Sequence, residues 1–323
     1  MVEGSEDMYK KLLMSGLMVT ALTTGIIQNV EAANQYKPKE DIFIQGADLN
    51  SNDLKETKDI LGVGNNVTTY KVTRNDVGHY TGTEYDFIHS SAYIQPKTFG
   101  RGVDVDIETP KNITRITRAQ YINAAITSGI QDATIKIAAI DPVSGEGALT
   151  GIYKAYEAQG NTLNQKDIQS AHQEMNDLAN ISASNAKKEG YSDEALNQAV
   201  ADMKSQIAEA KQNKQQINQT TINNIVNQTL HENNLNQVLN DNDIAMIQNL
   251  MMNVATSDVI NQDPKAFQKQ ANALKKDIQK RASDKLDELK HLNAEESRNI
   301  LQQIWDAIVD FFTKLYHWLM SFL

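Results

Sequence analysis

Residues 138–160, AAIDPVSGEGALTGIYKAYEAQG, join a β-branched run to a helical pattern through closely spaced glycines. Residues 133–140 have strand character, and residues 152–158 carry apolar side chains at helical spacing. A strand, a glycine-rich turn and a helix follow each other in this order in phosphate-binding loops. The stretch therefore predicts mixed strands and helices, and it raises a choice between a nucleotide-binding loop and a structural turn.

The residues around the glycines favour a structural turn. A P-loop needs Lys and then Ser or Thr after its last glycine, but Ile152 and Tyr153 follow Gly151. The G-x-G-x-x-x-G spacing is one residue longer than the dinucleotide fingerprint, and Glu146 would bring a carboxylate to any bound phosphate. We therefore expect no cofactor here, and we expect Ser144 to cap the helix while glycine permits the turn. The predicted turn residues are Ser144, Gly145, Gly147 and Gly151.

Composition limits the class of protein. The chain has 323 residues, of which 40% are hydrophobic and 22% are charged, as in folded globular proteins. A net charge of -10 argues against nucleic acid as a partner, because phosphate contacts need clustered Lys and Arg. Cysteine is absent, which excludes disulfides, thiolate nucleophiles and zinc ribbons.

The N-terminal segment, residues 1–32, has the layout of a secretory signal peptide. Lys10 and Lys11 precede an apolar run at residues 12–27, and Val30 and Ala32 are small residues at the positions that a signal peptidase reads. We expect cleavage after Ala32 and translation from Met8, because the residues before Met8 are acidic. The alternative is a retained anchor, although the run is shorter than the roughly 20 apolar residues of a spanning helix.

The mature chain divides by composition into an α+β arrangement. We expect a mixed α/β domain at residues 33–160, a Gln/Asn-rich all-helical domain at 161–295, and an apolar amphipathic tail helix at 296–323. Gly190 and Pro264 are expected to mark breaks between helices. Helices are predicted between Asn50 and Gly62 and between Thr117 and Gly129, and strands at residues 41–45, 67–73, 86–95, 102–109 and 133–140. The strands at 86–95 and 102–109 are expected to pair across the turn at 96–101.

Three further patterns contain residue types that can form chemical sites. Asp104, Asp106 and Glu108 alternate with apolar residues, which suits the charged face of an edge strand better than the curved oxygen cage of a calcium site. The histidines lie too far apart for a helical metal pair, and Ser90 and Ser91 lack a nucleophile elbow. We therefore expect no metal and assign no catalytic residue.

The tail at 296–323 is the strongest functional candidate in the sequence. Its apolar side chains cover almost the whole circumference of one helix, so we expect the helix to be buried against another protein surface or in a membrane interface. Docking on the helical domain, insertion into a membrane interface and contact with a second protomer are the three alternatives. The residues expected to make the contact are Ile304, Trp305, Ile308, Phe311, Phe312, Leu315, Trp318 and Leu319.

A family resemblance covers residues 42–160. The chain resembles the domain of unknown function 1002 family, whose members are predicted secreted proteins of Gram-positive bacteria. The matching residues are Asn112-Ile113, the run from Tyr121 to Ala125, Ser128-Gly129-Ile130, Asp132-Ala133, the run from Pro142 to Gly145, and the run from Ala148 to Ile152. Asp141 and Glu146 depart from the family pattern. The resemblance implies no catalytic residue and supports the structural interpretation of the glycines.

The sequence as a whole predicts a secreted, non-enzymatic protein of the cell envelope or extracellular space. Its tail helix is expected to contact the membrane or partner subunits, and its small-molecule ligand is left unassigned. Two alternatives remain open at this point: a secreted hydrolase with a carboxylate-based site, and a secreted effector that permeabilises membranes.

Overall fold

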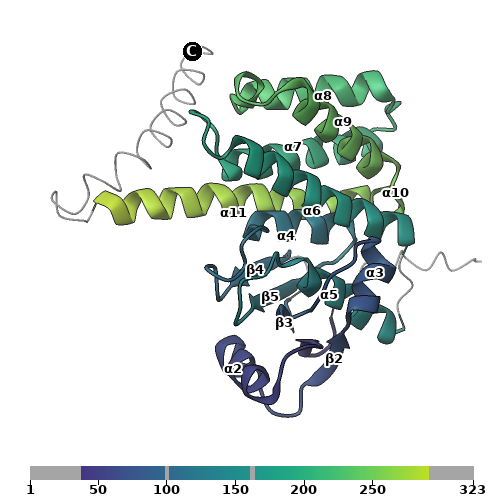
Figure 1. The fold of residues 1–323 in the computed structure, drawn as a ribbon. Helices are drawn as coiled ribbons and strands as arrows, with labels where there is room; N and C mark the ends of the chain where they lie inside the picture. The colour runs from purple at the N-terminus through teal and green to yellow at the C-terminus, as the bar shows by residue number, and fades with distance from the viewer. Residues whose placement is uncertain (1–37, 99–101, 161–163, 291–323) are drawn as a thin grey trace, which may run out of the picture. The chain divides into compact units, whose positions relative to one another are not determined.

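A mixed five-stranded sheet forms the centre of the N-terminal half of the chain (Figure 1). The computed structural model describes residues 38–98, 102–160 and 164–290. The strands lie in the order β2-β1-β3-β5-β4. They comprise β1 (Ile42–Gly46), β2 (Thr68–Val72), β3 (Ser91–Pro96), β4 (Asp104–Ile107) and β5 (Ala133–Ala138).

Two parallel βαβ units flank a central antiparallel strand. Strand β1 runs parallel to β2 and the two are joined through helix α2 (Ser51–Leu61), while β4 runs parallel to β5 through helix α4 (Arg118–Thr127). Strand β3 is antiparallel to both β1 and β5. The predicted pairing of residues 86–95 with 102–109 is therefore wrong, because β5 lies between β3 and β4.

The two faces of the sheet are covered unequally. Helix α2 covers the face that presents Phe43 and Tyr93, where a small apolar cluster forms with Leu61. Its ends match the sequence prediction, since the Asn50 side chain accepts the N–H groups of Asn52 and Asp53, and Gly62 ends the helix at a φ of 68°.

Helix α3 (Arg74–Thr81) was not predicted. Thr73 and Asp76 form a capping box, in which the hydroxyl of Thr73 accepts the Asp76 N–H and the Asp76 carboxylate accepts the Thr73 N–H. The sequence pattern predicts a strand that ends at Thr73 and no helix directly after it. Helix α3 packs on helix α5 (Glu146–Ala158), which lies against β1, β2 and β3.

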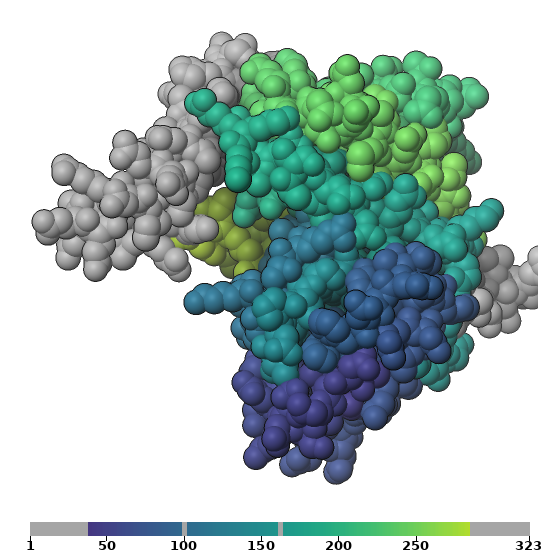
Figure 2. Space-filling view, viewed as in Figure 1, coloured from purple at the N-terminus to yellow at the C-terminus, as the bar shows by residue number. Residues whose placement is uncertain are grey.

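Within residues 164–290, seven helical segments follow α5. They are α6 (Gln165–Asn185), α7 (Asp193–Gln212), α8 (Gln219–Glu232), the short 3-10 turn η1 (Leu235–Gln237), α9 (Asp241–Thr256), α10 (Asp258–Gln262) and α11 (Pro264–Lys290). The predicted breaks are confirmed: Gly190 has a positive φ between α6 and α7, and Pro264 is the first residue of α11. The segments of the sheet half and the green α8 and α9 segments occupy separate parts of the surface (Figure 2). The expected α+β class is confirmed.

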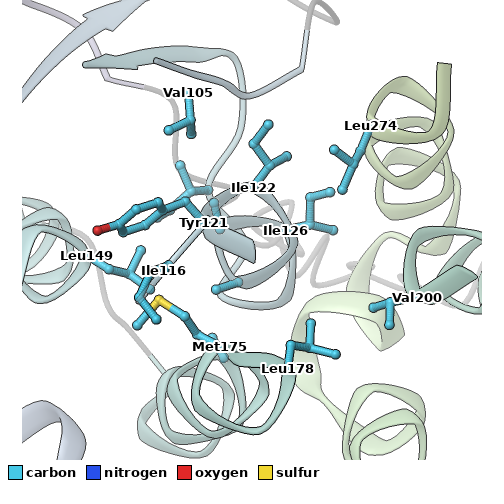
Figure 3. Packing of buried hydrophobic residues seen from close by; sticks show 14 of the residues in the cluster. Val105, Ile116, Tyr121, Ile122, Ile126, Leu149, Met175, Leu178, Val200 and Leu274 are labelled. Carbon is cyan, nitrogen blue, oxygen red and sulfur yellow. The ribbon is translucent and has the colours of Figure 1, made fainter. Parts of the chain in front are cut away.

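One continuous hydrophobic core joins the sheet to the helices. Its buried residues run from Ile42 on β1 to Ile278 on α11. Helix α4 lies at the centre of this core: Tyr121, Ile122 and Ile126 come between Met175 of α6 and Leu274 of α11 (Figure 3). The division at residue 160 stays a prediction, because the structure buries both sides of it in the same core.

The predicted signal peptide at 1–32 and the predicted tail helix at 296–323 lie outside the described residues. Within residues 38–98, 102–160 and 164–290, no helix combines the length and the apolar composition needed to cross a bilayer.

Candidate functional site

The glycine stretch is built into the start of helix α5. The helix begins at Glu146, six residues before the predicted start, so Gly147 and Gly151 are helical. Gly145 is the N-cap with a φ of 110°, and no side chain caps the helix. The predicted capping by Ser144 is therefore wrong, because the chain turns through the left-handed region one residue later, where only glycine fits without strain.

At each of the three glycines, the backbone of the α5 segment comes so close to neighbouring side chains that a Cβ atom would overlap them. A Cβ on Gly145 would lie 2.3 Å from the Tyr121 hydroxyl, which donates a hydrogen bond to the Gly145 carbonyl at 2.7 Å. A Cβ on Gly147 would lie 2.9 Å from the Ser90 hydroxyl, and one on Gly151 would lie 2.0 Å from Ile44. These positions place α5 tightly on the sheet and on α4.

Glu146 takes the position at which a phosphate-binding loop would hold its anion. Its side chain is fully buried at the first residue of α5, and its carboxylate accepts a hydrogen bond from Arg115 at 2.5 Å. Arg115 also donates to the side chain of Asn180 on α6, at 3.0 Å. A carboxylate is favoured at a helix N-terminus, so the chain supplies its own anion there.

Aromatic and imidazole groups surround this carboxylate. Burial, reinforced by the charge of Glu146, raises the pKa of the Tyr85 and Tyr121 phenols. Burial lowers the pKa of His172 on α6, although Glu146 opposes that shift. The second Glu146 oxygen, Oε2, has no hydrogen-bond partner among the described residues. The cluster is closed to solvent at its centre and ties the sheet half to α6.

A second buried charge pair joins three helices. Lys204 on α7 lies 2.6 Å from Glu174 on α6, and neither side chain is exposed by more than 1%. Lys204 also donates to the Asn123 carbonyl of α4 at 2.8 Å, and the Thr127 hydroxyl donates to the other Glu174 oxygen. The sequence analysis did not identify this network.

The three acidic residues of the edge strand face basic side chains. Asp104 pairs with Arg118, which also pairs with Asp277 of α11. Arg281 of α11 lies 3.6 Å from Asp106, and the Lys136 ammonium lies 3.5 Å from Glu108. No group of three potential metal-ligating side chains comes together within the described ranges.

His89 and Ser91 make separate contacts near the start of β3. His89 and Asp141 approach to 3.0 Å between Nδ1 and Oδ2, and the exposed Phe87 ring lies 4.7 Å from the imidazole. The hydroxyl of Ser91 at the start of β3 accepts the N–H of Gly46 at the end of β1, which gives Ser91 a structural role. His291 and His317 lie outside the described residues.

A polar cleft of about 610 Å³ lies where the start of α6 meets the end of α9 and the start of α10. Its volume falls in the range of small-molecule sites. Amide and hydroxyl side chains dominate the lining: Gln165, Gln169, Ser170, Gln173, Asn253 and Thr256. The lining side chains range from the buried Asp167 to the exposed Gln165 and Gln169, and the cleft is a candidate site that was not predicted from the sequence.

Asp167 holds the walls of the cleft together. Its two carboxylate oxygens accept the N–H groups of Asp258 and Val259, at 3.2 and 3.1 Å, and thereby cap α10 from α6. The Asn164 side chain caps α6 and donates to Asp258. Burial raises the pKa of Asp167 and the charge of Asp258 adds to this, while the two backbone hydrogen bonds oppose it.

The predicted contact residues of the tail, from Ile304 to Leu319, lie outside the described residues, so the structure does not place them.

Comparison with known proteins identifies relatives without an assigned activity. A family model described as protein of unknown function (DUF1002) matches residues 45–274, which is more than half of the chain. An uncharacterized protein of Bacillus subtilis (strain 168), YpuA, is 31% identical over 172 residues, which cover 51% of this chain and 58% of that protein. The chain thus aligns with less than two thirds of the length of that relative. No solved structure matches the chain significantly. The family match confirms the resemblance noted in the sequence, and the chain belongs to the DUF1002 family of proteins of unknown function.

Proposed function

We propose that the protein is exported and acts in the cell envelope or extracellular space by binding, without catalysing a reaction. The observation that carries export is the N-terminal order of charges and apolar residues: Lys10 and Lys11, the run at 12–27, then Val30 and Ala32. The structure of residues 38–290 is compatible with removal of the N-terminal segment, because every strand of the sheet, including the edge strands β2 and β4, comes from residues after position 38. Removal of residues 1–32 therefore leaves all five strands in place.

The arrangement of charges supports binding over catalysis. Glu146 is paired with Arg115, Glu174 with Lys204, and Asp104 with Arg118. Each of these carboxylates is thus committed to an ion pair that holds helices together. A catalytic acid or base would instead need a free proton site within reach of a substrate.

The tail at residues 296–323 is the segment through which the protein would attach to a membrane or to a second protomer. Trp305, Tyr316 and Trp318 are amphipathic aromatic residues of the kind enriched where a membrane meets water. The polar side of the tail lacks the Lys and Arg expected for anionic lipid, so a second protomer is the competing partner. The tail would hold the protein at a membrane in the first case and would join two protomers in the second, and in both cases the body would remain free to bind.

Processing of the chain in a Gram-positive host tests export. The full-length protein is expected in the envelope or the medium, with Ala33 as its N-terminal residue. Ala32→Tyr places a bulky side chain at the cleavage position and should leave residues 8–32 attached, whereas Ala33→Ser should be processed normally. Intact chain in the cytosol, with its N-terminal segment still present, contradicts the proposal.

Distribution between membrane and medium tests the tail. Phe312→Ser and Leu315→Ser together should release the exported protein from membranes, or lower its oligomeric state if the tail joins protomers. Thr313→Ser is a matched change on the same segment that leaves apolar surface intact. An unchanged distribution and an unchanged sedimentation coefficient would mean that the tail only docks on its own body.

A hydrolase is the second candidate, and one observation favours it. Asp167 and Asp258 both line the cleft, and the pKa of Asp167 is raised. Both Asp167 oxygens, however, already accept backbone N–H groups, which leaves that carboxylate in a capping role. Hydrolysis of an oligosaccharide by the wild-type protein, abolished in Asp258→Asn, would establish the hydrolase instead.

A further inference from the structure

The charges of the cleft exclude an anionic ligand. The first backbone N–H groups of α6 are already bonded to the Asn164 side chain, and those of α10 to Asp167 and Ser257. Lys166 is the cation of the lining, and the carboxylates of Asp167 and Asp258 outweigh it. An anion would therefore find no free helix N-terminus and would meet a net negative wall.

The same groups exclude a metal ion and an apolar molecule. The lining holds two carboxylates, and Asp167 uses both of its oxygens for α10, so too few carboxylate oxygens remain to form an oxygen cage. The lining residues are all amide, hydroxyl or charged side chains. An apolar ligand would have to desolvate these groups without replacing their hydrogen bonds.

Amides and hydroxyls can donate and accept in the same site. Gln165, Gln169 and Asn253 form no side-chain hydrogen bond with another described residue, so their amides are open to a ligand. Each amide offers two donor hydrogens and one acceptor oxygen, and the hydroxyl of Ser170 can do both. A ligand that matches this lining carries many neutral groups that also donate and accept.

We infer that this cleft binds a neutral polyhydroxylated ligand, a sugar unit of an oligosaccharide or glycan. This inference rests on the proposed binding function and names the class of its ligand. The two hydrogen bonds of Asp167 hold α6 against the junction of α9 and α10, which sets the distance between the helices that carry the amides. Because the lining has no aromatic ring for the sugar to stack on, the affinity is expected in the millimolar range.

Titration of the full-length protein with maltotriose and with N,N′-diacetylchitobiose, followed by NMR chemical shifts, tests the inference. At least one of the two should shift the amide resonances of α6 and α9 in a saturable manner. Gln169→Ala and Asn253→Ala should each weaken binding about fivefold, because each removes a hydrogen-bonding amide. Gln228→Ala removes an exposed amide on α8, outside the cleft, and should leave the affinity unchanged.

Two further arms identify the source of the sugar. A response to N,N′-diacetylchitobiose together with retention on insoluble chitin indicates a polymeric glycan, and a response to a soluble saccharide without retention on chitin indicates a free saccharide; either result supports the inference. Saturable binding of triglycine or of sulfate in place of the sugars would overturn it, as would silence with every saccharide at millimolar concentration. Cleavage of the bound oligosaccharide would overturn the non-catalytic function while leaving the ligand class intact. The export experiment is independent of all these outcomes.

Discussion

Lys204 of α7 and Glu174 of α6 form a completely buried ion pair, with 2.6 Å between Nζ and Oε1. Burial lowers the pKa of Lys204, and the adjacent Glu174 carboxylate opposes that shift. Transfer of two charges into a core is expensive unless each is paired and hydrogen-bonded. Here the Asn123 carbonyl and the Thr127 hydroxyl complete the network from α4.

Lys204→Met should destabilise the protein by about 3–5 kcal/mol, because it leaves Glu174 charged and unpaired in the core. The double variant with Glu174→Leu should recover part of this loss. Urea denaturation of each variant measures the difference. Lys275→Met is the control: its pair with Asp202, at 2.9 Å, joins α11 to α7 at a partly exposed position and is expected to contribute less than about 1 kcal/mol. Equal losses in the two lysine variants would contradict the buried role.

His172 should make the fold sensitive to mild acid. Burial lowers its pKa below the ordinary 6.5, while Glu146 raises it and Arg115 lowers it further. A histidine with a lowered pKa in the folded state adds stability that is complete above 6.5 and is lost as the pH falls through the folded value. His172→Gln should therefore flatten the dependence of unfolding free energy on pH below 6.5. The exposed His231→Gln variant should retain the wild-type slope.

Gly151→Ala should cost about 1–3 kcal/mol, because a Cβ there would overlap the branched side chains of Ile44 and Val72. Gly64→Ala is the matched control, since its Cβ would lie 3.7 Å from Val67 in ordinary contact. Thermal unfolding compares the two. A Gly151→Ala protein as stable as wild type would show that α5 can move away from the sheet.

Gly145 and Tyr121 should be energetically coupled. Gly145→Ala places a methyl group against the Tyr121 hydroxyl and forces a side chain into a φ of 110°. Tyr121→Phe removes that hydroxyl together with its hydrogen bond to the Gly145 carbonyl. The double variant should lose less stability than the sum of the single ones, with a coupling of about 0.5–3 kcal/mol in a denaturation cycle. If the two losses of unfolding free energy are additive, the Tyr121 hydroxyl does not contribute to the cost of Gly145→Ala, and that cost comes from the backbone strain at a φ of 110°.

Local signals in the sequence predicted much of the fold. The caps of α2 at Asn50 and Gly62 and the cap of α4 at Thr117 lie where the structure has them, because capping depends on neighbouring residues only. The pairing of β3 was mispredicted because adjacent strands usually pair, whereas here β5 arrives from later in the chain.

The buried Lys204–Glu174 pair and the polar cleft were harder to predict than the helix caps. Lys204 lies four residues after the buried Val200, and Glu174 three residues after the buried Ala171, so both occupy apolar faces of their helices. A charge at such a position is the signal that could have revealed the pair, but its partner comes from a different helix. The cleft left no signal in the sequence, since its amides look like ordinary solvated side chains and only the meeting of α6, α9 and α10 brings them together.

Arg118 and Asp277 are 159 positions apart, yet they connect α4 with α11 beside the β4 strand. Since α11 also packs along α7, the native contacts of the sheet half are incomplete until the last described helix has been synthesised. Such distant closure slows folding relative to a chain with local contacts. The sheet half therefore reaches its final packing only after α11 has been synthesised, so this packing is a late event in folding.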